Sequence, residues 1–143
     1  MRISQLMKEA PVSIAHSASI EQAAELMKQN ECGILPITQS GLKPAGVLTD
    51  RDIVLRCIAV GRDPRVMTVA ECCSEPAICW DDECSAEDAF HTMRERDVGR
   101  LLVLDTQGQL AGIVSMADII ARVPKEIWNQ LPGAKKPLPR QAA

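Results

Sequence analysis

The spacing of apolar residues after Ser19 predicts an amphipathic helix. The apolar positions that would share one helical face are Ile20, Ala23, Ala24 and Met27. Ser19 precedes them and Gln22 follows it by three positions, the arrangement in which two side chains cap a helix N-terminus reciprocally. The helix is therefore expected to begin directly after Ser19.

Short apolar runs on both sides of this helix predict strands. Pro11 is followed by a short run at residues 12–14, and two further runs occupy Ile34–Thr38 and Ala45–Thr49, with a Ser40-Gly41 turn between them. A second helix is expected from Thr49 or Asp50 to about Val60, before Gly61 and Pro64. The order is β-α-β-β-α, preceded by a helical turn at Ile3–Met7, and it indicates an α/β fold.

The same order returns 66 positions later. Ala45–Val54 comes back as Ala111–Ile120, with Ser85 as the second cap, strands expected at 101–104 and 110–115, and a last helix at 116–122. No gap is needed to keep this register. The chain is therefore interpreted as two tandem copies, 1–65 and 66–124, followed by a flexible tail at 125–143.

Length and composition fit this interpretation. One copy of about 60 residues alone would bury only about 60% of its unfolded surface, so we expect the copies to share a core. The 143-residue chain is 46% hydrophobic, enough to supply that core.

Each copy ends in glycine, two hydrophobic residues, a hydroxyl residue, two variable positions and aspartate. This motif resembles the signature of CBS domains, and the resemblance covers roughly Met1 to Val123. It implies an α/β (α+β) fold of two β-α-β-β-α units related by a pseudo-twofold axis.

The motif also has a chemical interpretation. A strand that passes directly into a helix is expected to leave the first-turn N–H groups unpaired and pointing outward, where they favour phosphate, and a hydroxyl at Thr49 or Ser115 adds a donor. An aspartate three residues later, Asp52 or Asp118, can accept hydrogen bonds from a ribose diol. The structural alternative is that these are ordinary helix caps, with the aspartates complementing the helix dipole.

The resemblance implies an adenine-type ligand, such as AMP, ADP, ATP, NAD or S-adenosylmethionine, in a cleft between the units. Hydroxyls would contact phosphate, aspartates the ribose, and apolar residues the base. Arg100 matches a phosphate-binding position in the family and Arg51 could flank the same cleft, although either arginine could be a solvated surface residue. The candidate nucleotide-binding residues are Thr49, Arg51, Asp52, Ser115, Asp118, Arg100, Gly33, Ile34, Gly99, Val12 and Ile78.

Charge and hydropathy disfavour other classes of partner. The net charge is −3, the pI is about 5.4 and only 2% of residues are aromatic, which argues against nucleic acid. No apolar run is long enough for a membrane span, and the N-terminus shows no secretory signal. We therefore expect a cytoplasmic protein.

Cysteine and histidine patterns do not predict catalysis or a metal site. The spacing of Cys72, Cys73, Cys79 and Cys84 does not match that of zinc sites. Most cysteines align with apolar residues of the other copy, which favours core packing, with a redox-sensitive thiol or a metal ligand as alternatives. His16 and His91 lack a nucleophile and an acid in recognisable spacing.

The expected function is that of a non-catalytic sensor without a tightly bound cofactor. An adenine nucleotide would act as the regulatory ligand, and the bound state would be read by a homodimer or by a protein partner regulated in trans. The alternatives are an interaction or structural protein with a vestigial cleft, and a thiol-redox or metal sensor.

Overall fold

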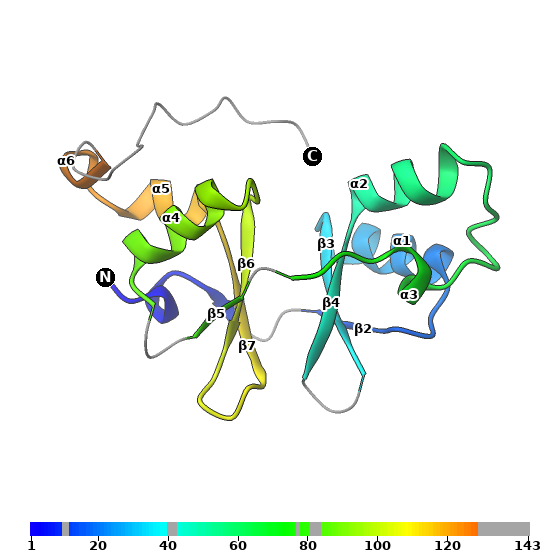
Figure 1. The fold of residues 1–143 in the computed structure, drawn as a ribbon, viewed down its shortest axis with the longest axis horizontal. Helices are drawn as coiled ribbons and strands as arrows, with labels where there is room; N and C mark the ends of the chain where they lie inside the picture. The colour runs from blue at the N-terminus through cyan, green and yellow to red at the C-terminus, as the bar shows by residue number, and fades with distance from the viewer. Residues whose placement is uncertain (10–11, 40–42, 77, 81–83, 129–143) are drawn as a thin grey trace. The chain divides into compact units, whose positions relative to one another are not determined.

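The computed structural model describes residues 1–9, 12–39, 43–76, 78–80 and 84–128 (Figure 1). The chain divides into two compact units. One, here named the contiguous unit, is formed by the described residues of Pro11–Pro76; the other, the split unit, combines those of Met1–Ala10 with the described residues from Ile78 to Trp128. The compact units therefore do not coincide with the expected sequence boundaries, 1–65 and 66–124.

The contiguous unit contains a three-stranded sheet in the order β2-β3-β4, with β2 parallel and β4 antiparallel to β3. Its elements follow the β-α-β-β-α order expected from the sequence, with a short helix added at the end (Figure 1). They are β2 (Ile14–Ala15), α1 (Ile20–Asn30), β3 (Ile34–Thr38), β4 (Pro44–Thr49), α2 (Asp50–Ile53), η2 (Val54–Ile58) and α3 (Val69–Cys72).

The split unit contains a four-stranded sheet in the order β1-β7-β6-β5. The strand β1 comes from the N-terminal segment and pairs antiparallel with β7. The elements of this unit are η1 (Ile3–Gln5), β1 (Lys8–Glu9), β5 (Ile78–Trp80), α4 (Ala86–Glu95), β6 (Arg100–Leu104), β7 (Leu110–Ser115), α5 (Met116–Arg122) and α6 (Lys125–Trp128).

Each copy contributes its opening segment to the unit formed by the other copy. Lys8 of β1 lies opposite Ile113 of β7, and the matching residue Ser74 lies opposite Val47 of β4. Backbone bonds keep the same 66-residue relation, since Ala86 donates to the Met1 carbonyl and Ile20 to that of Met67, both at 2.9 Å. The repeat therefore extends to the way in which the opening segments pack.

Each unit has its own buried core. In the contiguous unit, the stripe of α1 packs with the apolar side chains of β3 and β4 and with two buried cysteines, Cys57 and Cys72. In the split unit, α4 and α5 pack with η1 and with β6 and β7. Among the candidate stripe residues, Ala24 is exposed, whereas Ile20, Ala23 and Met27 are buried as expected.

The helix expected from Asp50 to about Val60 changes geometry part of the way along. Asp50–Ile53 is α-helical, and Val54–Ile58 continues as a π-helix. The strand expected at residues 12–14 is found one residue further along, as Ile14–Ala15, with Val12 and Ser13 outside it. The Ser40-Gly41 turn lies outside the described residues, as does residue 129 onward of the expected tail; its first four residues form α6.

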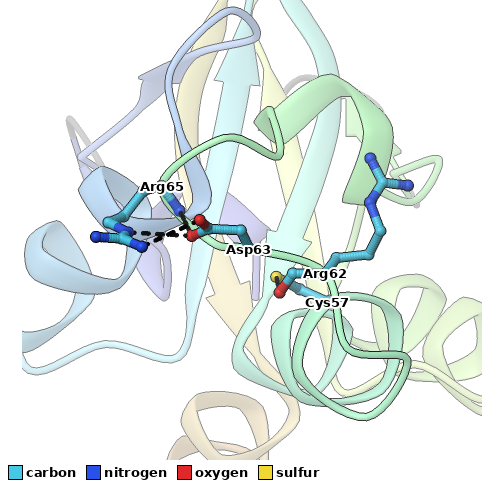
Figure 2. A network of polar contacts seen from close by, with 4 residues as sticks. All are labelled: Cys57, Arg62, Asp63 and Arg65. Atoms are coloured by element: carbon cyan, nitrogen blue, oxygen red, sulfur yellow. Dashed lines mark hydrogen bonds and ion pairs between the residues drawn. The ribbon is translucent and has the colours of Figure 1, made fainter.

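A loop at residues 61–68 closes the N-terminal end of α1. Asp63 and Arg65 shape this loop through three hydrogen bonds of 2.9 to 3.2 Å (Figure 2). Beside them, the Pro64 carbonyl accepts the Glu21 N–H at 2.9 Å. First-turn donors of α1 are thus paired with the loop backbone. Within the described ranges, no helix has the length and hydropathy that a membrane span requires.

Candidate functional site

In the contiguous unit, the candidate site begins where β4 passes directly into α2. Thr49 is the last residue of the strand and the N-cap of the helix. Its Oγ1 accepts the Asp52 N–H at 3.1 Å, and Oδ2 of Asp52 accepts the Thr49 N–H at 3.0 Å. This reciprocal pair fixes both side chains at the turn.

The split unit repeats this turn where β7 passes into α5. Oγ of Ser115 accepts the Asp118 N–H at 3.1 Å, while Oδ2 of Asp118 accepts the Ser115 N–H at 3.0 Å and the Ser115 hydroxyl at 2.7 Å. Asp118 is exposed to solvent. Within the part of the chain that the structure describes, no group bonds the second carboxylate oxygen, Oδ1 of Asp118.

A glycine carbonyl pairs with the first N–H of each helix. The Asp50 N–H donates to Gly33 at 2.9 Å, and the Met116 N–H donates to Gly99 at 2.8 Å. The Arg51 N–H donates to Oδ1 of Asp50 at 2.8 Å. The expectation of unpaired first-turn N–H groups is therefore wrong for residues 50–52, where each N–H has an acceptor within the chain.

The sheet register places the predicted cation beside the predicted hydroxyl in the split unit. Arg100 at the start of β6 lies directly opposite Ser115 at the end of β7. In the contiguous unit the corresponding pair is Ile34 opposite Thr49. Directly opposed residues of an antiparallel pair project from the same face. Arg100 is half-buried, and no described residue forms an ion pair with its guanidinium.

The two turns differ in what surrounds them. A Cβ built on Gly33 would lie 2.9 Å from Oδ2 of Asp50, whereas one built on Gly99 would meet nothing within 4 Å. The Ser74 hydroxyl lies 3.2 and 3.3 Å from the two oxygens of Asp52. Sequence reasoning missed Asp50 and Ser74.

The signal that could have revealed these two residues is a mismatch between the copies. Asp50 aligns with Met116, and Ser74 aligns with Lys8. At both positions, the two aligned residues differ in charge.

The remaining candidates are accessible to solvent, and no described contact joins their side chains to either turn. Val12 and Ile78, which match each other in the repeat, are exposed by 37% and 39%. Arg51 lies exposed on the first turn of α2. All three stay predictions as contacts of base or phosphate.

Arg56 and Arg122, which also match each other, have a structural role. Arg56 Nη1 donates to the carbonyls of Cys72 at 3.1 Å and Cys73 at 2.9 Å, and Arg122 Nη1 donates to that of Gln5 at 3.4 Å. Each arginine thus ties its helix to the opening segment contributed by the other copy.

The cysteines fall into different environments. Cys57 and Cys72 are buried and free, and burial, followed by the nearby charge of Asp52, raises the pKa of the Cys72 thiol. Cys32 and Cys73 are free and partly buried. Cys84 is disulfide-bonded and packs against the core of the split unit. Among the described residues, no cluster of three or more His, Cys, Asp or Glu side chains could hold a metal ion.

Comparison of the sequence with models of known protein families agrees with the repeat and with its two capped strand-to-helix turns. A model described as CBS domain matches twice, at residues 3–58 and 69–125. This chain belongs to the CBS domain family. Each CBS domain match covers one sequence copy, and the opening segment of each match packs with the unit formed by the other.

Two curated relatives align with most of the chain. It is 35% identical over 117 residues to the CBS domain-containing protein YhcV of Bacillus subtilis, which covers 82% of this chain and 81% of YhcV. It is 31% identical over 120 residues to hypoxic response protein 1 of Mycobacterium tuberculosis, covering 84% and 83% of the two chains.

Two solved structures share the fold. Hypoxic response protein I, crystallised with two coordinated zinc ions, aligns with a TM-score of 0.78 and 29% identity, covering 87% of this chain and all of that one. The CBS domain protein PAE2072 from Pyrobaculum aerophilum, crystallised with AMP, aligns with a TM-score of 0.79 and 26% identity, covering 92% and 98%.

Proposed function

We propose that this protein is a non-catalytic sensor that binds an adenine-type ribonucleotide at its strand-to-helix turns. The observation that carries the proposal is the set of groups at the split unit's turn. There, Asp118 offers a carboxylate oxygen, Oδ1, that no described residue bonds, and Arg100 lies opposite Ser115 on the neighbouring strand. A carboxylate can accept from a ribose diol, and an arginine can hold phosphate through two parallel bonds.

The AMP complex of PAE2072 supports the ligand class. We propose AMP, ADP, ATP, NAD or S-adenosylmethionine as an exchangeable regulatory ligand. The exposed apolar side chain of Ile78, which lies in the same unit as Asp118, would contact the base. Burying it against an adenine ring would add a favourable hydrophobic contribution.

We further propose that the signal is passed through a homodimer or to a partner protein. Support comes from an apolar surface on the helical segment after Thr49, here named the η2 surface and made of Val54, Leu55 and Ile58. These side chains are 55%, 49% and 56% exposed. Aliphatic side chains clustered on one exposed helical surface are typical of an interface with another chain.

A thermal-shift screen tests the ligand class. A ligand that binds the folded protein at 100 times its Kd adds about 2.7 kcal/mol to the free energy of unfolding. We expect a rise in Tm with at least one of AMP, ADP, ATP, NAD and S-adenosylmethionine, and no rise with orthophosphate alone at the same concentration. No shift with any adenine ligand would instead support an interaction protein with a vestigial site.

A further inference from the structure

We infer that the two turns are unequal in ligand binding, and that each chain binds one ribonucleotide, with its diol on Asp118. This inference rests on the proposed function and adds the stoichiometry and the cause of the inequality. In the contiguous unit, two side chains of the same unit contact the corresponding carboxylate, Asp52, or lie beside it on the turn. These are named the closing contacts.

The first closing contact is the Ser74 hydroxyl on Asp52. It lies 3.2 Å from Oδ1 and 3.3 Å from Oδ2, while Oδ2 also accepts the Thr49 N–H at 3.0 Å. Ser74 is held in place because its backbone pairs with Val47 at 2.9 and 3.0 Å. A protein hydroxyl therefore already lies against both oxygens of the carboxylate that a ribose hydroxyl would have to reach.

The second closing contact is Asp50 over Gly33. The Asp50 carboxylate fills the space where a Gly33 Cβ would stand, at 2.9 Å from Oδ2, and Oδ1 accepts the Arg51 N–H at 2.8 Å. A second negative charge thus lies beside Asp52 on the same turn. This charge opposes the approach of a phosphate.

Both contacts are missing in the split unit. Met116 stands in the place of Asp50 and Lys8 in that of Ser74, so neither position supplies a carboxylate or a hydroxyl. The space over Gly99 is open to 4 Å. Asp118 keeps Oδ1 without a partner among the described residues, and Arg100 brings a positive charge in place of Ile34.

Isothermal titration of the full chain with AMP tests the inference. We expect one AMP per chain for the unmodified protein. Asp118→Asn should weaken binding at least tenfold, because the new amide can keep the Ser115 cap bond but presents a donor where the diol needs an acceptor. Thr92→Ala, at a half-buried position of α4 outside the turn, is the matched control and should bind like the unmodified chain.

The double variant Asp50→Ala/Ser74→Ala tests the closing contacts directly. Removing both side chains should raise the stoichiometry from one AMP to two per chain. Circular dichroism melting of every variant separates loss of binding from loss of fold. If the double variant does not fold, the Asp118→Asn titration still decides the inference.

Two outcomes would overturn the inference and leave the proposed function intact. One is two AMP per chain in the unmodified protein, with one remaining after Asp118→Asn. The other is one AMP per chain with an affinity that Asp118→Asn does not change. Absence of AMP binding in the unmodified chain would overturn the inference as stated, and no shift with any other adenine ligand would also overturn the proposed function.

Discussion

Arg100 and Ser115 are directly opposed residues of an antiparallel strand pair, and this fixed register places a cationic side chain on the same face of the sheet as the hydroxyl that caps α5. Strand pairing holds the two backbones, so their proximity does not depend on an ion pair. The contiguous unit has Ile34 opposite Thr49 at the same register. The repeat thus preserves the geometry and changes the charge.

This relationship predicts the effect of removing the cation. Arg100→Ala should weaken AMP binding by about 1.5–3 kcal/mol, the range for a hydrogen bond to a charged group. Titration calorimetry at low and at 0.5 M salt would measure it, and the difference between variant and unmodified chain should shrink with salt. Arg96→Ala, at the exposed C-terminal end of α4, is the control. A loss of equal size in the control would contradict a specific role for Arg100.

The packing of the N-terminal segment predicts a requirement for glycine at residue 112. A Cβ there would stand 2.5 Å from Sδ of Met7 and 2.9 Å from the Lys8 carbonyl. Since the carbonyl belongs to β1 and cannot swing aside, Gly112→Ala should destabilise the protein by about 1–3 kcal/mol. Urea unfolding would measure this loss.

Gly99→Ala is the matched control for Gly112→Ala. A Cβ at residue 99 meets nothing within 4 Å, so the free energy of unfolding should stay within about 0.5 kcal/mol of that of the unmodified chain. Equal losses for the two variants would contradict the packing of Met7 and Lys8 over β7.

The η2 surface predicts a charge-sensitive dimer. Leu55→Glu should weaken self-association at least tenfold, or about 1.4 kcal/mol, because a carboxylate would be buried in an apolar contact. Light scattering coupled to gel filtration over a concentration series would measure it. Ala121→Glu places the same charge at the matching exposed position of α5 and should leave association unchanged. Dimers of equal strength in the two variants would exclude the η2 surface as the interface.

The loop that closes α1 gives a pH prediction. The Arg65 side chain, followed by its backbone N–H, holds the pKa of Asp63 below its ordinary value (Figure 2). A lowered folded pKa adds stability that is present above the unfolded pKa and lost as pH falls through the folded pKa. The side chain is exposed, so the contribution is small.

An NMR titration of the Asp63 carboxyl carbon would measure this shift directly. Arg65→Gln should move the pKa of Asp63 up toward its ordinary value, because the charged donor is lost. Arg62→Gln, in the same loop, removes the ion pair with Glu71 of α3. This variant should leave the pKa of Asp63 unchanged. An Asp63 pKa that is the same with and without Arg65 would contradict the assignment.

The fold could be predicted largely from local patterns. The helix start at Ser19 and the strand Ile34–Thr38 follow from capping and apolar spacing, and both are found as expected. Local patterns could not predict that the opening segment of each copy packs in the unit formed by the other copy. A two-residue strand such as Lys8–Glu9 pairs across about 100 positions of sequence, and local pattern carries no information about so distant a partner.

The candidate turns were also predictable as caps, because the hydroxyl and the aspartate stand at fixed spacing. The side chains that surround the two turns were harder to predict. The contact between Ser74 and Asp52 joins residues 22 positions apart through a linker that carries no motif. The π-helix at Val54–Ile58 has no spacing signal of its own, although it accompanies the hydrogen bonds of Arg56 to Cys72 and Cys73.

The measurement that tests the account most directly is a paired calorimetric titration with AMP and with 2′-deoxy-AMP. If the Asp118 carboxylate accepts the ribose hydroxyls, AMP should bind more tightly by about 1–3 kcal/mol, the scale of a lost hydrogen bond that leaves a polar group unpaired. Asp118→Asn should remove that preference. Equal affinity for the two sugars in the unmodified protein would contradict the role of the carboxylate.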